Sequence, residues 1–190
     1  MSEEPGPAEE QELLTVGHGT HAQEALAGLL RSVGVASVVD VRIAPGSRRF
    51  PQFSRSELER WLPAAGISYR WERRLGGFRK LPQDSPDVAL ANPSFRAYAA
   101  HMRTGEFGAA MAVLVADAAA RLTAIMCSES LWWRCHRRLI ADHAALIERL
   151  RVRHLMPDGR LAVHEPTAGV RVADRQLRYD RLPEPEQLPF

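Results

Sequence analysis

Lysine is almost absent from this chain of 190 residues: Lys80 is the only lysine among 25 basic residues, and the other 24 are arginines. The preference for arginine over lysine has two explanations. One is the composition of the genome, which would also explain the abundant alanine, and the other is a functional need. Arginine suits planar, bidentate recognition of phosphate and carboxylate groups, so a clustering of arginines favours the functional explanation. The formal net charge is only +2, so the molecule as a whole is not a polycation.

The chain also has few cysteines and no long apolar run. Two cysteines are too few for a disulfide framework, and a reducing compartment keeps both as thiols. No apolar run approaches about 20 residues, which predicts no membrane-spanning helix. The N-terminal segment MSEEPGPAEEQE is acidic and lacks the basic and apolar regions of a signal peptide, which indicates a cytoplasmic protein. Hydrophobic residues make up 45% of the chain, as expected of a folded domain.

Two apolar runs with a helical pattern between them predict a βαβ unit. LLTVGH (13–18) and the β-branched run ASVVDVR (36–42) are typical of buried strands. Residues 21–33 carry apolar side chains at the helical period, and Gly34 ends that helix. A helix between two such strands implies a parallel sheet.

The rest of the chain continues the α/β pattern. Ser54 followed by Glu57 forms a capping-box pattern that begins a helix ending near Pro63. The further elements expected are strands at 67–71, 123–127, 152–156 and 160–165 and helices at 94–103, 106–120 and 135–150.

These elements predict a single three-layer α/β domain with a mostly parallel sheet and helices on both faces. We expect residues 1–12 to form a flexible acidic leader and 13–165 to form the domain. Residues 166–190 are expected to add an edge hairpin (169–180) and a C-terminal tail.

Reactive side chains cluster where three of the predicted strands end. The segments GHGTH (17–21), DVRIAPGSRRF (40–50) and CSESLWWRCHRR (127–138) each follow a strand. Ligands of open parallel sheets bind beyond the carboxyl ends of the strands, so we expect these segments to line one site. Its expected members are His18, Asp40, Arg42, Arg48, Arg49, Cys127, Glu129, Cys135, His136 and Arg137.

The segment 127–138 concentrates arginine at the start of a helix, where positive charge opposes the helix dipole. An anionic ligand, or a carboxylate such as Glu129, would explain Arg134, Arg137 and Arg138. Nearby positive charge also lowers the pKa of a thiol, so Cys127 is either a nucleophile or a small buried residue at the end of its strand. For Cys135 the sequence favours packing on the helix.

The two other segments add candidates for anion binding and proton transfer. Asp40 and Arg42 lie at alternate positions and so share a face, either as a structural ion pair or, with Arg48, as part of a phosphate-binding loop. His18 either transfers a proton or caps a loop.

The spacing of the cysteines argues against two familiar sites. A phosphatase-type loop places five residues between cysteine and arginine, whereas six lie between Cys127 and Arg134. Cys127, Cys135 and His136 could bind zinc with another histidine, but their spacing is not a standard zinc pattern, and we predict no metal and no cofactor.

The motifs TVGHGT, VVDVRIAPGSRRFPQFS, LGGFRK, CSESLWWRCHRRLIADH and GRLAVH together resemble the DUF488 family, a widespread bacterial group of uncharacterised α/β proteins. The resemblance covers Leu14 to His164. Members typically carry a Cys-x-Glu-x5-Cys-His-Arg pattern, matched here by Cys127, Glu129, Cys135, His136 and Arg137. Many members carry proline at the position of Trp132, which places this chain in a Trp-Trp subgroup. The resemblance implies the α/β fold and these motif residues, and it implies no reaction.

Two functions fit these observations. The first is an enzyme, of unassigned reaction, that acts on an anionic nucleotide, nucleic acid or other phosphorylated substrate. Its expected catalytic residues are Cys127, Glu129, His18, His136 and Asp40, and its expected anion-binding residues are Arg42, Arg48, Arg137 and Arg134.

The alternative is a non-catalytic module that associates with nucleic acid in DNA repair or stress response. The arginines would contact the backbone, and Trp132 or Trp133 would stack on bases. The C-terminal QLPF (187–190) partly resembles the peptides by which bacterial proteins dock on the replication sliding clamp, which makes the clamp a further candidate partner. No membrane partner is expected.

Overall fold

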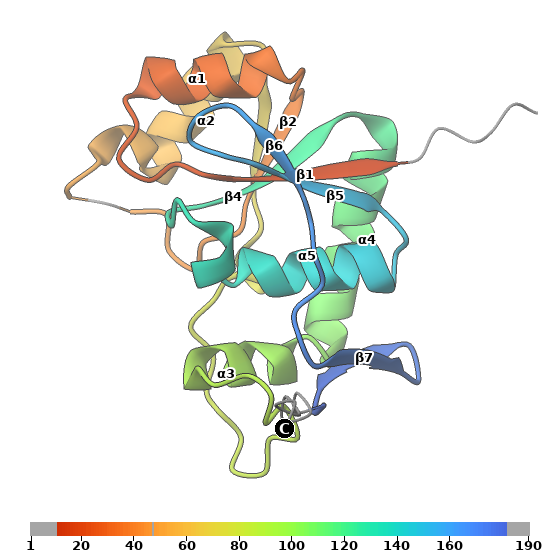
Figure 1. Cartoon of the computed structure of the whole chain (residues 1–190). Helices are drawn as coiled ribbons and strands as arrows, with labels where there is room; N and C mark the ends of the chain where they lie inside the picture. Colours follow the sequence, from red (N-terminus) through yellow and green to blue (C-terminus); the bar gives the residue numbers. More distant parts are fainter. Residues whose placement is uncertain (1–10, 47, 182–190) are drawn as a thin grey trace, which may run out of the picture.

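The computed structural model describes residues 11–46 and 48–181. Within these residues six strands form one sheet in the order β3-β2-β4-β1-β5-β6 (Figure 1). The strands from β1 to β5 are parallel, and β6 pairs antiparallel with β5. The strands are β1 (Glu12–Gly17), β2 (Ser37–Asp40), β3 (Ser68–Trp71), β4 (Thr123–Cys127), β5 (Arg151–Leu155) and β6 (Leu161–Val163).

The helices cover both faces of this sheet (Figure 1). Helices α1 and α2 bury their apolar sides against one face together with Leu14 and Val16 of β1, whereas α4 and α5 pack on the other face with Leu13. Neighbouring residues of a strand point to opposite faces, which is why one strand supplies both cores. The helices are α1 (Gln23–Ser32), α2 (Arg55–Ala64), α3 (Pro93–His101), α4 (Gly105–Ala120) and α5 (Arg137–Leu146). The predicted single three-layer α/β domain is therefore confirmed.

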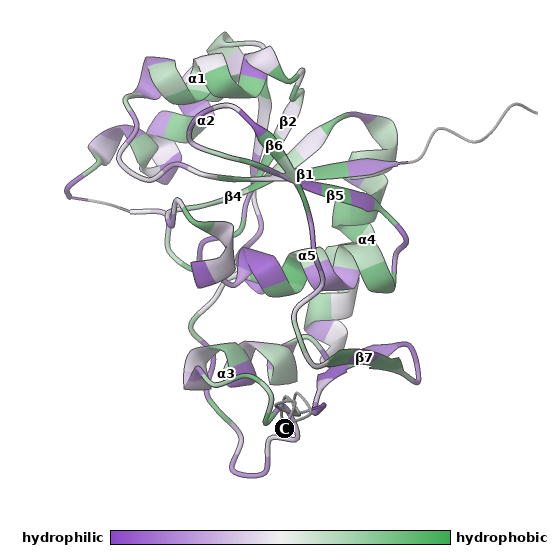
Figure 2. Cartoon of the chain, viewed as in Figure 1, coloured by the Kyte–Doolittle hydropathy of each residue, from purple (hydrophilic) through white to green (hydrophobic). Residues whose placement is uncertain are grey.

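Hydrophobic and hydrophilic residues alternate along α1 (Figure 2), as expected of a helix with one buried face. None of the described helices combines the length and the apolar character needed to cross a membrane.

One predicted helix cap and one predicted helix start differ from the structure. Ser54 is the N-cap of α2, but its hydroxyl makes no capping hydrogen bond and lies 3.3 Å from the hydroxyl of Ser56, so the predicted capping box does not form. Helix α5 begins at Arg137 rather than at Cys135, because Cys135 has extended backbone angles (φ −123°, ψ 150°). Cys135 thus precedes the helix, and its buried side chain belongs to the same apolar core as Leu139 and Ile140 of α5.

The C-terminal hairpin forms, but it is not at the edge of the main sheet. Strands β7 (Val170–Ala173) and β8 (Gln176–Tyr179) form a separate two-stranded sheet beside α3 (Figure 1). The segment before β7 is held on α5, where the N–H of Thr167 donates to Asp142 Oδ1, so the chain leaves the sheet after β6. The predicted edge position was therefore wrong. The leader residues 1–10 and the tail residues 182–190, which include QLPF, lie outside the described residues.

Candidate functional site

Three strand ends meet at one edge of the sheet, as the sequence predicts. β4 lies between β1 and β2, with Gly17 paired to Cys127 and Asp40 paired to Met126. The segments that follow stay together, because the N–H of His18 donates to the carbonyl of Cys127 at 3.0 Å. A cleft of about 720 Å³ opens at this edge. Its lining includes both cysteines and five other predicted site residues, His18, Arg42, Glu129, Arg134 and His136, and Asp40 is buried behind Arg42.

The lining of the cleft thus contains six of the nine predicted catalytic and anion-binding residues, because Cys127 is among them, whereas Arg48, Arg137 and Asp40 do not line it. Arg48 is exposed on the loop between β2 and α2. Arg137 and Asp40 are buried, and each contacts a residue that does line the cleft.

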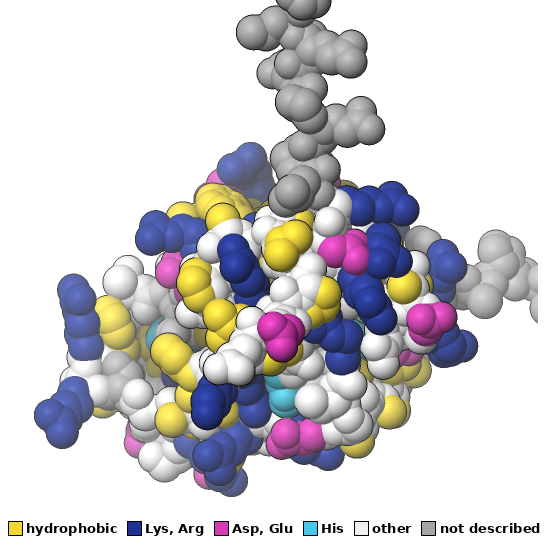
Figure 3. All heavy atoms as spheres, turned by 90° about the horizontal axis from the view of Figure 1, so that it is seen from below, with side chains coloured by type: hydrophobic (Ala, Val, Ile, Leu, Met, Phe, Trp, Pro, Cys, Tyr) yellow, Lys and Arg dark blue, Asp and Glu magenta, His cyan; other side chains and the backbone are white. Residues whose placement is uncertain are grey.

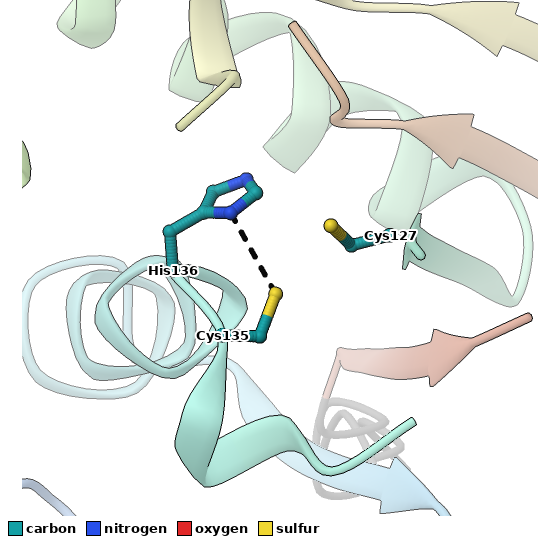
Figure 4. A group of neighbouring side chains, drawn as sticks. All are labelled: Cys127, Cys135 and His136. Atoms are coloured by element: carbon teal, nitrogen blue, oxygen red, sulfur yellow. Dashed lines mark hydrogen bonds between the residues drawn. The ribbon is translucent and has the colours of Figure 1, made fainter. Parts of the chain in front are cut away.

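The two cysteines and His136 form a compact group on the floor of the cleft. Their ligand atoms, the two sulfurs and one ring nitrogen, lie within 4.8 Å of one another. The side chains come from the end of β4 and the start of α5 and point toward one another (Figure 4). Nδ1 of His136 lies 3.6 Å from Sγ of Cys135, while Nε2 lies 3.0 Å from the carbonyl oxygen of Val41. With Nε2–H donating to Val41, Nδ1 is left as an acceptor that faces the sulfur.

The structure favours Cys135, rather than Cys127, as the thiolate. Hydrogen bonding with Cys127 and the charge and N–H groups of Arg137 lower the pKa of Cys135 to about 6 against the desolvation of burial. The same interaction with Cys135, together with burial, raises the pKa of Cys127 to about 12. Because Arg137 contacts Cys135 and not Cys127, Cys135 is the sulfur that is better placed to hold a negative charge.

Arg137 explains why a negative sulfur is stable here. Its side chain is 1% exposed, its Nε lies 3.5 Å from Sγ of Cys135, and Nη2 donates to the backbone carbonyl of Glu129. Within residues 11–46 and 48–181 no carboxylate forms an ion pair with Arg137. A buried guanidinium without a countercharge is strongly destabilising, so the thiolate and Arg137 stabilise each other. Arg137 is thus placed to hold Cys135 rather than a ligand.

The same three side chains could hold a soft metal ion. Two sulfurs and a histidine nitrogen, with a fourth position open to the cleft, are a ligand set typical of zinc, and the contact between His136 and Val41 would orient the ring. Arg137 already supplies positive charge to Cys135, so the thiolate needs no metal as its countercharge.

Asp40, Arg42 and His18 form a second buried network. Asp40 accepts from Nε and Nη2 of Arg42, at 2.9 and 2.5 Å, and from the hydroxyl of Tyr69 at 2.9 Å. Nη2 of Arg42 also donates to the carbonyl of Phe53, and Nη1 lies 3.2 Å from Nε2 of His18. Four of the five N–H groups of Arg42 therefore have partners inside the protein, and the remaining Nη1–H is the one available to the cleft.

His18 is a neutral member of this network. Burial and the charge of Arg42 lower the pKa of His18 to about 4. Nδ1 lies 3.1 Å from the carbonyl of Gly19 and donates to it, so Nε2 accepts from Arg42, and the ring stacks on Phe53 with centroids 4.3 Å apart. Asp40 and His18 are thus placed to orient Arg42, which differs from the proton transfer considered for His18 and agrees with the ion pair considered for Asp40.

Glu129 and Arg134 lie at the cleft with different surroundings. Oε1 of Glu129 accepts from the N–H of Leu131 at 3.2 Å, which braces the loop after β4. Arg134 is exposed at the rim and ends the short 3₁₀ helix η3 (Trp132–Arg134). Arg134 is therefore the cleft residue whose positive charge is most accessible to a ligand.

Several residues that support the site gave weak signals in the sequence. A Cβ on Gly17 would lie 2.0 Å from the carbonyl oxygen of Glu129, so only glycine allows the loop after β4 to pass this close. A Cβ on Gly77 would lie 3.1 Å from Nδ1 of His136, so the loop that contains Gly77 covers the ring. The glycine pair 76–77 was the available signal, but nothing in the sequence identifies His136 as its partner.

A chain of buried polar groups lies behind the tryptophan pair. Nδ1 of His154 accepts from the hydroxyl of Thr15 at 2.8 Å, Nε2 of His154 lies 3.0 Å from Nδ1 of His164, and Nε2 of His164 lies 2.9 Å from Asp142. The ring of Trp132 stacks on His154 with centroids 3.8 Å apart. Trp132 thus packs η3 against strand β5 of the sheet, as the sequence favoured. Trp133, by contrast, is 42% exposed.

The fold and this site define a class: a one-domain α/β protein with a sulfur pair and a histidine at the carboxyl edge of its parallel sheet. The model of the domain of unknown function DUF488 matches residues 21–144, which is more than half of the chain. The chain therefore belongs to the DUF488 family, as its motifs indicated. No curated protein and no solved structure matches it.

Proposed function

We propose that this protein is an enzyme that acts on an anionic substrate in the cleft at the carboxyl edge of the sheet, with the thiolate of Cys135 as its nucleophile. The observation that carries the proposal is the contact between Cys135 and the buried guanidinium of Arg137, at the N-terminus of α5 and beside an open cleft. The positive charge of the buried Arg137 favours the thiolate form of Cys135 at neutral pH. The thiolate is the reactive form of cysteine.

The neighbouring groups suit this chemistry. Nδ1 of His136 faces Sγ of Cys135 and can accept the thiol proton, because its other nitrogen is occupied by Val41. The Cys127 thiol, whose sulfur lies within 4.8 Å of that of Cys135, lowers the pKa of Cys135 further. This division of roles replaces the predicted nucleophile Cys127 by Cys135 and keeps His136 as the proton-transfer residue.

The charges at the cleft favour a substrate with a negative group. Arg134 is exposed at the rim, and Arg42 has one N–H left for a ligand. Serine and threonine hydroxyls on the lining, at Thr20, Ser128 and Ser130, can donate to the same group.

The proposal is tested by alkylation of the reduced protein with iodoacetamide over a range of pH, with the modified cysteine identified by mass spectrometry. We expect Cys135 to react first, with a rate that rises through about pH 6 rather than through the ordinary value of about 8.5. Cys135→Ser should remove this reaction, whereas the matched variant Cys127→Ser should keep it. Inorganic phosphate should slow the alkylation of the wild type. A Cys135 that reacts only above pH 8 would overturn the proposal.

Turnover gives the second arm of the test. A panel of phosphate esters and nucleotides is incubated with the wild type, Cys135→Ser and Cys127→Ser. A substrate that is consumed by the wild type and not by Cys135→Ser is the expected result, since removal of a nucleophile abolishes the covalent step.

The second candidate is a module that associates with nucleic acid. The exposed basic residues Arg48 and Arg49 and the exposed aromatic residue Trp133 favour this function. On the face seen in Figure 3, basic side chains are spread among acidic and hydrophobic ones rather than joined into one stripe. This face thus lacks the continuous basic stripe typical of a surface that binds a nucleic-acid backbone. Binding to DNA that weakens steeply with salt and is unaffected by Cys135→Ser would support the second candidate instead.

A further inference from the structure

Phe78 lies at the edge of the cleft and combines an exposed side chain with a rare backbone conformation. Its side chain is 90% exposed, and its backbone has φ 54°, in the left-handed region that bulky residues rarely adopt. Left-handed backbone at a bulky residue destabilises the folded chain, and a ring that stays in water contributes no burial free energy to offset this cost. Phe78 also belongs to the lining of the cleft.

The turn that presents Phe78 is held from several sides. A Cβ on Gly76 would lie 2.8 Å from Cα of Ile43, and one on Gly77 would lie 3.1 Å from Nδ1 of His136, so the backbone of the turn packs directly on both. Arg79 fixes the other end, with Nε donating to the carbonyl of Gly76 at 3.0 Å and Nη2 to that of Arg74 at 3.0 Å. The exposure of Phe78 is therefore built into an anchored turn.

The lining of the cleft has two chemical characters. Phe78 and Phe95 provide apolar rings, whereas Arg42 and Arg134 provide guanidinium groups. The contact of Gly77 with His136 places the Phe78 turn directly over the group that contains Cys135. A ligand that reaches both parts needs a flat apolar portion joined to an anionic one, and a volume of about 720 Å³ has room for both.

We propose that the ligand of this cleft is a mononucleotide, whose base stacks on Phe78 and whose phosphate faces Arg42 and Arg134. This inference rests on the proposed function and names its substrate class. Stacking on an aromatic ring holds every base, because each base has a flat π-face, and it would cover the exposed ring.

The inference is tested by calorimetric titration of the full-length, reduced protein with the nucleoside monophosphates AMP, GMP, CMP and UMP, and with adenosine and ribose 5-phosphate. We expect at least one nucleotide to bind, with adenosine and ribose 5-phosphate each at least about tenfold weaker, because each lacks one of the two contacts. Ribose 5-phosphate that binds as tightly as the nucleotide would overturn the inference, as would binding of oligonucleotides alone.

Variants of Phe78 sharpen the test. Phe78→Gly should weaken nucleotide binding at least about tenfold and leave the unfolding midpoint unchanged or higher, because glycine relieves the left-handed backbone. Phe78→Trp should restore binding, and Val88→Ala, which changes an exposed apolar residue outside the lining, should leave it unchanged. Equal nucleotide affinity in Phe78→Gly and wild type would contradict the inference.

The two proposals fail separately. Alkylation of Cys135 reports the thiolate without any nucleotide, and Cys135→Ser should still bind the nucleotide, because the sulfur is not one of the proposed contacts. A reactive Cys135 in a protein that binds none of the four nucleotides refutes the substrate class and leaves the nucleophile in place.

Discussion

Asp40 and Arg42 are two positions apart in the chain, and each can be buried because the other is. Asp40 is fully buried, and its two oxygens accept from the side chain of Arg42 and from Tyr69. Removing one partner of a buried pair leaves an uncompensated charge, whereas removing a single hydrogen bond to the pair has a much smaller effect. The pair also determines which N–H of Arg42 faces the cleft.

We therefore expect Asp40→Asn to destabilise the protein by about 3–5 kcal/mol, because the guanidinium of Arg42 would lose its countercharge. Tyr69→Phe, the matched control, removes one hydrogen bond to the same carboxylate and should cost about 1 kcal/mol. Urea unfolding at pH 7, followed by circular dichroism, measures both free energies of unfolding. An Asp40→Asn variant as stable as Tyr69→Phe would show that the ion pair is not needed for the fold.

Cys127 influences the charge of its neighbour Cys135. Its sulfur lies within 4.8 Å of that of Cys135, and its interaction with Cys135 is the largest cause of the lowered pKa of Cys135. In Cys127→Ala the thiol is absent, so the pKa of Cys135 should rise from about 6 by about one pH unit, the equivalent of one hydrogen bond to a charged group.

The measurement is the pH dependence of iodoacetamide labelling at Cys135. Cys127→Ser keeps a donor at the same place and should show a smaller rise than Cys127→Ala. An unchanged midpoint in Cys127→Ala would mean that Arg137 and the helix start alone determine the charge of Cys135.

At the scale of elements, the site depends on how closely the loop after β4 passes the end of β1. The carbonyl of Glu129 accepts from Arg137, and the same carbonyl occupies the place where a side chain at Gly17 would begin. Strand β1, the loop and the start of α5 are thus joined at one point.

Gly17→Ala should destabilise the protein by about 1–3 kcal/mol, because the new Cβ overlaps the backbone of Glu129. It should also slow the alkylation of Cys135 near pH 6, since displacement of the carbonyl releases Arg137 from its position. Gly28→Ala is the matched control: nothing lies within 4 Å of its new Cβ, and in the middle of α1 it should stabilise by about 0.5–1 kcal/mol. Urea unfolding and labelling of both variants measure these effects, and a Gly17→Ala variant that behaves like Gly28→Ala would contradict the close approach.

The elements also show what a sequence can predict and where it stops. TAIMC and SVVD are continuous apolar or β-branched runs, so the buried parallel strands and the edge where they end could be predicted. The thiolate form of Cys135 could not be predicted, because it depends on Arg137. The side chain of Arg137 contacts Cys135 and the carbonyl of Glu129 only in the folded chain. Phe78 lies in a segment without periodicity, so neither its exposure nor its contact with the site could be read from the pattern.

At the scale of the whole molecule, burial of histidine governs how the fold responds to acid. His18, His143 and His154 come from the end of β1, from α5 and from β5, and all three are buried. Burial is the largest cause of their lowered pKa values, which are about 4, 4 and 3. In the unfolded chain each would titrate near 6.5, so below that pH the unfolded state binds more protons than the folded state.

Stability should therefore be highest above about pH 6.5 and should fall as the pH drops from 6.5 toward 4, by up to about 1.4 kcal/mol per pH unit for each of the three histidines. Urea unfolding at pH 7, 5.5 and 4.5 measures this loss. His143→Leu provides the control, because within the part of the chain that the structure describes Nδ1 of His143 has no hydrogen-bond partner and lies 3.7 Å from Oε1 of Glu148. This variant should be at least as stable as the wild type at pH 7 and should lose less stability at pH 4.5, since one of the three proton-binding groups is gone. A wild type that is equally stable at pH 7 and 4.5 would show that these histidines are not held neutral by the fold.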